Sequence, residues 1–431
     1  MLCTMSGKAA VCNTALAPIR HVALHLILVL LISTPVLPAA ESAKAALLVI
    51  DQEVAADTGL TAALATYRQQ VRSTFGYRLI QVVADAAIAP EDMRALLRQW
   101  VQQERIAGAF LVGRFRLATF RGGCGDLAAF PEFFQDLDGD IRDEDGDGIY
   151  DVYDPWPVSP TAPACELWLA MLRPYPVSPR GGSGLDELTT YFTRITATMQ
   201  APAQTTAATI FASHDWPDQD GLHRALQASV RSPVRLFGGK DPQSKQALRT
   251  TVREFREALA EPSNLLCSFI HSSVSVHTLD GPDYPGNLVV PGEMDNPGRV
   301  LLDDMPVNAR VMTFWSCHLL DIEHVTYLHG RFLANSYLLR PGSRAEAILA
   351  PARSIGLEYQ EVLIRALRTA PLCEAWLSYQ NHLYSRPVLR QFLDRVWQQE
   401  GRRFAWHAMI YGNPFVHVFG TSAQGIRLPG R

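Results

Sequence analysis

The sequence predicts an α/β protein built on a mostly parallel sheet, and three observations lead to this fold class. Short apolar runs rich in Val, Ile, Leu and Phe recur along the chain, as in strands that are covered on both faces. Stretches with helical spacing stand between the first of these runs, which is typical of βαβ units. The chain has 431 residues, enough for two or three domains or for one large α/β core.

The first elements alternate between strand and helix. Strands are expected at residues 45–51, 77–83 and 106–113, and helices at 60–75 and 89–104. In the first helix, Leu60, Leu64, Tyr67 and Val71 recur at the spacing of one helix face. Pro90 begins the second helix, and the acidic residues that follow it favour a helix start.

The pattern resumes after a turn-rich insert and a linker, "QAPAQTTA". Further strands are expected at residues 208–213, 234–239, 265–270 and 310–315, and within 345–356 and 406–420. Further helices are expected at 185–199, 243–259, 321–339, 363–383 and 388–399. The predicted parts are a signal segment (1–40), an N-terminal α/β subdomain (41–205) with the insert (114–164), a second α/β subdomain (206–420) and a tail (421–431).

The N-terminus has the features of an export signal. Lys8 and Arg20 precede the apolar stretch 22–32, and a region of small residues follows, with a plausible cleavage point near Ala39 or Ala40. The apolar stretch is shorter than the ~20 residues of a membrane span. We expect a secreted, periplasmic or cell-envelope protein with no stable membrane span after cleavage; an uncleaved anchor is the alternative.

The charge of the chain bears on its partners, and its cysteines show which thiols could be reactive. The net charge is −4 and no run of Lys or Arg occurs, so nucleic acid is not expected as a partner. Five cysteines follow the predicted signal, and this odd number leaves at least one thiol unpaired. Cys124 and Cys165 could pair across the insert, Cys267 lies in mid-strand, and Cys317 suits a reactive thiol.

Two predicted strands end in residues with nucleophilic or basic side chains. His271 follows the apolar run 265–270, and Ser316 and Cys317 follow the run 310–315. In an open α/β sheet, ligands bind at the carboxyl ends of the strands, so His271 and Cys317 could share one crevice. An imidazole can take the proton of a thiol and return it to a leaving amine. The alternative is a buried cysteine and a core histidine without chemistry.

Backbone N–H groups after the two strands could hold a developing oxyanion. The candidates lie near Ser272 and Cys317, with Ser316 and Ser272 as supporting side chains. His277 is a second candidate for the basic residue, ranked lower because it falls beyond the strand end. These residues together could attack a carbonyl carbon and protonate a leaving amine.

The centre of the insert contains a pattern typical of a calcium loop. Acidic residues occupy positions 1, 3, 5, 9 and 12, and a glycine occupies position 6: Asp143, Asp145, Asp147, Asp151, Asp154 and Gly148. Calcium needs several hard oxygens around one ion, and glycine permits the sharp turn. We expect a structural Ca²⁺ site, with a solvated acidic loop as the alternative. Three further acids could form a second site or complete the first: Asp136, Asp138 and Asp140.

The stretch from about residue 45 to 420 resembles the gingipain-like family of cysteine peptidases, relatives of caspases and legumains. The resemblance is carried by His271 in "IHS", by Cys317 in "SC", by the insert "DLDGD…DGDG", by "AEAILAPARSIG" and by "GNP" near the end. Ile270 and Ser272 replace the glycines that flank the family's catalytic histidine. The resemblance implies two caspase-like α/β subdomains with helices on both faces of mostly parallel sheets. It also implies a Cys317–His271 endopeptidase and an insert that stabilises the fold.

Two other functions remain open from the sequence. A processing protease or transpeptidase of the cell envelope would use the same two residues. The replaced glycines could instead mark a catalytically degenerate relative that is kept as a calcium-dependent binding protein.

Overall fold

The apolar runs form ten strands of one sheet in a computed structural model of the chain. The structure describes residues 43–121, 127–154, 163–175, 184–200, 207–213, 216, 219–238, 250–279, 288–290, 299–323, 332–353, 360–385 and 407–419. In spatial order the strands are β10 (Arg235–Gly238), β9 (Ala208–Ala212), β11 (Ser263–Phe269), β16 (Ala309–Trp315), β17 (Ala347–Pro351), β18 (Ala408–Gly412), β8 (Trp168–Leu172), β3 (Gly108–Val112), β1 (Ala45–Asp51) and β2 (Arg78–Ala84). The predicted α/β class with a large, mostly parallel sheet is confirmed.

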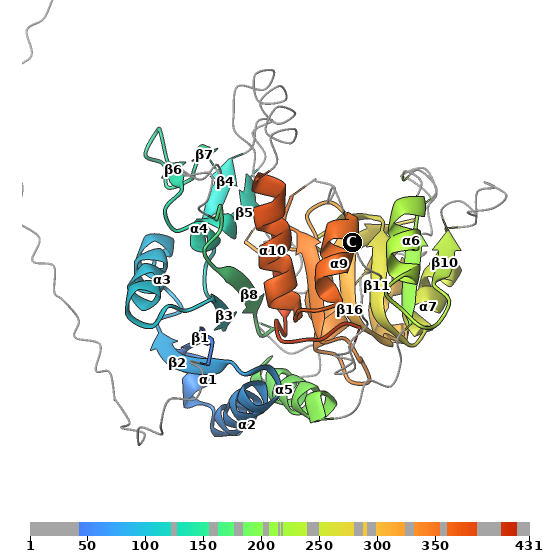
Figure 1. The fold of residues 1–431 in the computed structure, drawn as a ribbon, viewed down its shortest axis with the longest axis horizontal. Helices are drawn as coiled ribbons and strands as arrows, with labels where there is room; N and C mark the ends of the chain where they lie inside the picture. The colour runs from blue at the N-terminus through green and yellow to red at the C-terminus, as the bar shows by residue number, and fades with distance from the viewer. Residues whose placement is uncertain are drawn as a thin grey trace, which may run out of the picture. The chain divides into compact units, whose positions relative to one another are not determined.

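Strand direction changes once across the sheet. The strands from β10 to β17 are parallel, β18 is antiparallel to β17, and β18, β8, β3, β1 and β2 are parallel again. The carboxyl ends of β11 and β16 therefore lie at the same edge as the amino ends of β18 and β8. This edge, which we call the upper edge, is uppermost in Figure 1.

Helices connect the strands as the sequence indicated. The described helices are α1 (Gln52–Ala56), α2 (Thr58–Phe75), α3 (Pro90–Glu104), α4 (Glu132–Gln135), α5 (Gly184–Gln200), α6 (Asp220–Gln227), α7 (Val252–Ala260), α8 (Leu333–Leu338), α9 (Gln360–Leu367) and α10 (Leu372–Tyr384), with a 3₁₀ turn η1 (Leu302–Asp304). Figure 1 shows α3 on one side of β1 and β2, and α2 beside α5 on the other. None of these helices combines the length and apolar character needed to cross a bilayer.

Local sequence explains where α2 begins and ends. The Asp57 carboxylate accepts a hydrogen bond from the Leu60 N–H at 2.7 Å, which caps the first turn. The chain leaves the helix at Gly76, whose φ of +69° suits a residue without Cβ. The apolar face predicted from the sequence is confirmed, because Leu60, Leu64 and Tyr67 are buried together with Val71.

Within the described parts of the chain, three smaller sheets stand outside the main one. The insert forms β4 (Thr119–Arg121) with β5 (Leu127–Ala129), and β6 (Asp140–Arg142) with β7 (Val152–Asp154). Four short strands follow β11: β12 (His271–Ser273), β13 (Val276–Thr278), β14 (Leu288–Val290) and β15 (Arg299–Leu301). The segment between β11 and β16 thus contains short strands that the sequence did not predict.

Several predicted helices have different bounds. The helix expected at 363–383 is two helices, because Pro371 cannot continue α9 and instead precedes α10. The helix expected at 321–339 is absent at 321–323, and α8 begins only at Leu333. Helix α7 begins at Val252, after a capping box formed by Thr251 and Glu254.

Other sequence predictions fall outside the described residues. These are the signal segment 1–40, the linker 201–206, the helix at 388–399 and the tail 421–431.

Candidate active site

His271 and Cys317 lie at corresponding positions beyond two neighbouring parallel strands. The register pairs Phe269 of β11 with Trp315 of β16, and the Ile270 N–H donates to the Trp315 carbonyl at 3.2 Å. His271 and Cys317 each stand two residues beyond that pair. Neighbouring strands are ~4.8 Å apart, so both residues reach the same part of the upper edge.

The surroundings of Cys317 differ from those of the other described cysteines. Cys165, Cys267 and Cys373 are buried free thiols, whereas Cys317 is partly exposed. Burial raises the pKa of Cys267 to about 12 and that of Cys165 well above its usual range. Cys124 lies outside the described residues, so its pairing with Cys165 stays a prediction. Among the described thiols, Cys317 is the accessible nucleophile.

The chain turns sharply after Cys317. His318 has a φ of +54°, which is uncommon for a residue with a side chain. The Leu320 N–H then donates to the Pro351 carbonyl at the end of β17, at 3.0 Å. Ser316 is buried, and its Oγ has no hydrogen-bond partner among the described atoms. The turn therefore presents Cys317, and not Ser316, at the edge of the sheet.

His271 lies beside an aromatic group. Its ring centroid is 5.8 Å from that of Trp216, which in turn contacts Phe269 at 5.8 Å. Phe269 stacks on Trp315 with centroids 4.6 Å apart. Phe269 and Trp315 end β11 and β16, and Trp216 follows β9 in the chain, so the packing that orders the strand ends also supports His271.

His277 is held inside the molecule and not at the edge. Its Nδ1 is 2.6 Å from Ser272 Oγ and its Nε2 is 2.8 Å from the Tyr337 hydroxyl. The ring stacks on Phe314 of β16, and burial lowers its pKa to about 3. His277 is therefore neutral and hydrogen-bonded on both nitrogens, which suits a structural role. Its partner Ser272 is fixed beside His271 by the same bond.

The loop after Cys317 contacts the insert. Asp321 accepts a hydrogen bond from the Ala129 N–H of β5 at 3.2 Å. Glu323 accepts one from the Leu117 N–H at 2.9 Å and forms a partly buried ion pair with Arg173. The candidate catalytic loop and the insert are thus joined by contacts at the upper edge.

The acidic loop between β6 and β7 brings three of the five predicted ligands together. Carboxylate oxygens of Asp143, Asp145 and Asp151 lie within 4.8 Å of one another. The Asp143 carboxylate accepts from the N–H groups of Gly146 and Gly148, both at 2.8 Å. These glycines have φ values of +75° and +85°, which permit the tight turn. The all-oxygen donor set fits Ca²⁺.

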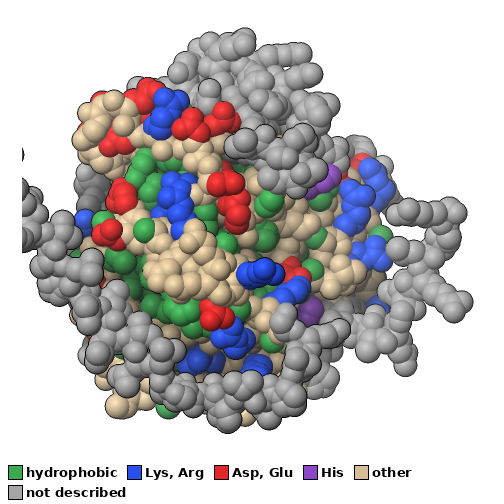
Figure 2. All heavy atoms as spheres, turned by 60° about the vertical axis from the view of Figure 1, so that its left-hand side comes forward, with side chains coloured by type: hydrophobic (Ala, Val, Ile, Leu, Met, Phe, Trp, Pro, Cys, Tyr) green, Lys and Arg blue, Asp and Glu red, His purple; other side chains and the backbone are tan. Residues whose placement is uncertain are grey.

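The side chain of Arg121, from β4, contacts the acidic residues of the same loop. It pairs with Asp147, and lies 3.4 Å from Asp145 and 4.0 Å from Asp151. Asp154 lies on β7 opposite Asp140 of β6. Figure 2 shows acidic and basic side chains interspersed where the insert comes forward. The loop therefore already contains one cation, and Asp143, Asp145 and Asp151 are the better candidates for metal ligands.

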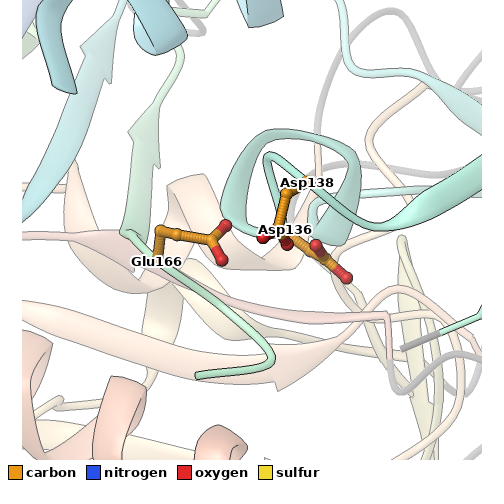
Figure 3. Close-up of side chains that lie close together, drawn as sticks. All are labelled: Asp136, Asp138 and Glu166. Atoms are coloured by element: carbon orange, nitrogen blue, oxygen red, sulfur yellow. The ribbon is translucent and has the colours of Figure 1, made fainter. Parts of the chain in front are cut away.

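The structure contains a second acidic group, and only part of it was predicted. Carboxylates of Asp136, Asp138 and Glu166 lie within 4.8 Å of one another (Figure 3). Burial raises the pKa of Asp136 to about 7 and that of Glu166 to about 7. Asp140 instead pairs with Arg142 at 3.1 Å. Glu166 carried no signal in the sequence, because it stands far along the chain from the two aspartates and two residues before β8.

Comparison with known proteins adds no assignment. No model of a known protein family matches the chain, and no curated protein matches it.

Proposed function

We propose that the protein is an exported cysteine endopeptidase of the gingipain-like type, with two caspase-like subdomains that share the sheet. The observation that carries the proposal is the corresponding position of His271 and Cys317 beyond the paired ends of β11 and β16. The partial exposure of Cys317, against the burial of the other described thiols, supports its role as the nucleophile.

In the proposed reaction, His271 removes the proton of the Cys317 thiol and the thiolate attacks the scissile carbonyl carbon. The carbonyl oxygen becomes an oxyanion that backbone N–H groups near Ser272 and Cys317 stabilise. The carbon–nitrogen bond then breaks, and His271 gives its proton to the departing amine. A water molecule, deprotonated by His271, hydrolyses the thioester, which releases the acid and restores the thiol.

A structural Ca²⁺ in the insert belongs to the same proposal. Asp143, Asp145 and Asp151 would hold it, while Arg121 neutralises Asp147. The ion would stabilise the loop between β6 and β7 and take no part in the chemistry. Melting temperatures in excess calcium and in chelator test this: we expect the Asp143→Asn variant to lose the increase that calcium gives the wild type.

Cleavage of a mixed peptide library tests the catalytic assignment. We expect Cys317→Ala and His271→Ala to reduce cleavage by at least ~10³-fold. His223→Ala, a change on α6, is the matched control and should keep wild-type cleavage. Wild-type cleavage by Cys317→Ala would overturn the assignment.

Two further measurements separate the alternatives. A peptidyl chloromethyl ketone should label Cys317 in an active enzyme, whereas a degenerate binding protein leaves it unlabelled. A primary amine added to the reaction distinguishes hydrolysis from transpeptidation, because a cell-envelope transpeptidase would form a new amide bond with it.

A further inference from the structure

A chain of hydrogen bonds runs from the buried core to Ser272, the residue after His271. Ser272 of β12 pairs in register with His277 of β13, and its Oγ lies 2.6 Å from His277 Nδ1. His277 Nε2 lies 2.8 Å from the hydroxyl of Tyr337, which belongs to α8. His277 and Tyr337 are both 0% exposed, whereas Ser272 is partly exposed. The chain therefore starts in the core and ends at an accessible hydroxyl next to His271.

Burial keeps the two inner members of this chain uncharged. It lowers the pKa of His277 to about 3 and raises the pKa of Tyr337 well above its usual range. Near pH 7, Tyr337 therefore keeps its O–H, and the ring of His277 has one N–H and one nitrogen lone pair. A neutral imidazole that bonds through both nitrogens donates from one and accepts at the other. The hydrogen bonds can thus run either from Tyr337 to Ser272 or from Ser272 to Tyr337.

The burial of Tyr337 selects the first of these directions. Within the described residues, the Tyr337 hydroxyl forms no hydrogen bond other than the one to His277. If His277 donated to this hydroxyl, the tyrosine proton would be buried without an acceptor, which is costly. The Tyr337 O–H therefore donates to His277 Nε2, and the His277 Nδ1–H donates to Ser272 Oγ.

This direction leaves the proton of the Ser272 hydroxyl available to a ligand. Ser272 Oγ accepts from His277, and it makes no other hydrogen bond to the part of the chain that the structure describes. An O–H group whose oxygen already accepts a hydrogen bond is a stronger donor, because hydrogen bonds in a chain polarise one another. Since the hydroxyl and the backbone N–H belong to the same residue, both can reach one oxygen atom.

We propose that the Ser272 hydroxyl is a further donor to the substrate oxyanion, with its direction set by Tyr337 through His277. The inference rests on the proposed peptidase reaction, in which N–H groups near Ser272 and Cys317 hold that oxyanion. Ser272 would touch the reacting atoms, whereas His277 and Tyr337 are positioning residues. A serine in this place adds a donor that the glycine of the gingipain-like motif lacks.

Steady-state cleavage of a peptide substrate tests the donor. Ser272→Ala should lower kcat at least ~10-fold with little change in KM, because an oxyanion donor acts in the transition state. Ser272→Thr keeps a hydroxyl and should stay within about threefold of the wild-type kcat. Ser273→Ala is the matched control and should cleave as the wild type does, since this neighbouring hydroxyl of β12 accepts from the Ser275 N–H and does not bond to His277.

NMR of protein labelled with nitrogen-15 in its histidine rings tests the direction of the chain without reference to cleavage. Near pH 7 we expect the Nδ1–H tautomer of His277. Its signals are assigned by their loss in His277→Gln and by their shift in Ser272→Ala, which changes the partner of Nδ1. Circular dichroism checks that each variant is folded.

Either measurement can overturn the proposal. Wild-type kcat in Ser272→Ala, or the Nε2–H tautomer of His277 in the wild type, would do so. An inactive wild type would instead refute the proposed function, and the tautomer of His277 would still decide whether Ser272 presents a donor beside His271.

Discussion

Two histidines close in sequence have opposite surroundings. His271 is partly exposed at the end of a strand, whereas His277 is buried and bonded to Ser272 and Tyr337. A catalytic base must exchange its proton in every turnover. His277 is held neutral by burial, with a pKa of about 3, and its proton is fixed in these bonds. His271 is therefore the better candidate, as its place at the strand end indicated.

Separate alanine variants distinguish the two roles. His277→Ala leaves a cavity beside Phe314 and deprives the buried Tyr337 hydroxyl of its partner. We expect a loss of about 3 kcal/mol in the free energy of unfolding. His271→Ala should change stability by less than about 1 kcal/mol but abolish cleavage. Urea denaturation and peptide cleavage of both variants provide the measurement, and an equal loss of stability would contradict this division.

Glu132 and His407 form a buried pair at the start of β18. The His407 N–H donates to Glu132 Oε1 at 2.6 Å, and His407 Nδ1 lies 3.7 Å from Glu132 Oε2. Burial raises the pKa of Glu132 to about 8 and lowers the pKa of His407 well below its usual range. Both side chains are therefore neutral near pH 7.

This pair predicts a pH dependence of stability. The folded-state pKa of Glu132 exceeds its unfolded value of 4.5, so its contribution is complete below that pH and is lost as pH rises through about 8. Glu132→Gln removes this loss. Relative to the wild type, the variant should gain up to about 5 kcal/mol between pH 4.5 and 9, measured by urea denaturation. Glu144→Gln, at an exposed position of the insert, is the control. The prediction would be refuted if the free energy of unfolding of Glu132→Gln changed with pH in parallel with that of the wild type.

At the scale of elements, the buried strands could be predicted from the sequence, but the way in which strands pair could not. Apolar runs located β1, β11 and β16 because each is buried along almost its whole length. The three-residue strands β12 to β15 were missed, since so short a segment shows no periodicity. His271 and Cys317 could be predicted as candidate site residues because each one follows the end of an apolar run. Nothing in the sequence indicated that Glu166 would join Asp136 and Asp138.

An ion pair between Arg173 and Glu323 adds to the hydrogen bonds that join the loop after Cys317 to the insert. Arg173 binds Glu323 and also donates to the carbonyls of Ile322 and Phe115. The side chains of Arg173 and Glu323 are 15% and 14% exposed, so water screens the pair only in part. We expect this pair to hold the loop after Cys317 in place.

A double-mutant cycle measures that contribution. Glu323→Ala should cost about 3 kcal/mol, because it leaves Arg173 buried without its carboxylate. Arg173→Ala should cost a similar amount, and the double variant less than the sum, with a coupling of about 1 to 3 kcal/mol. Urea denaturation of all four proteins gives the cycle. Additive losses would show that the pair does not hold the loop.

At the scale of the molecule, one sheet crosses the boundary between the two predicted subdomains. Residues 41–205 supply β1, β2, β3 and β8, and residues 206–420 supply the other six strands. The two sets meet where Ile410 and Tyr411 of β18 pair with Ala170 and Met171 of β8. The reversal of direction at β18 could not be inferred from the sequence, because an apolar run has the same pattern in either direction.

A buried network of polar side chains links the two predicted subdomains where β18 pairs with β8. This network leads to a prediction of how the molecule unfolds. Asn413 Oδ1 accepts from the Tyr67 hydroxyl at 2.8 Å, its N–H donates to the Tyr191 hydroxyl at 2.7 Å, and its Nδ2 lies 3.5 Å from Glu346 Oε2. Tyr67 and Tyr191 come from the first half of the chain, and Glu346 comes from the second. Asn413→Ala keeps the backbone N–H that binds Tyr191 but removes the side-chain amide, which leaves the buried Tyr67 hydroxyl without its acceptor and should cost about 3 kcal/mol.

Because the network and the sheet join both halves, we expect the wild type and Asn413→Ala each to melt in one transition. Calorimetry should give equal calorimetric and van't Hoff enthalpies, with a lower melting temperature in the variant. Tyr67→Phe, which removes one hydroxyl and keeps the ring, should fall between the two. Hydrogen exchange at β1 and β11 gives an independent measure, and the variant should lose protection equally in both strands. Two separate transitions in the wild type would mean that the halves fold independently despite the shared sheet.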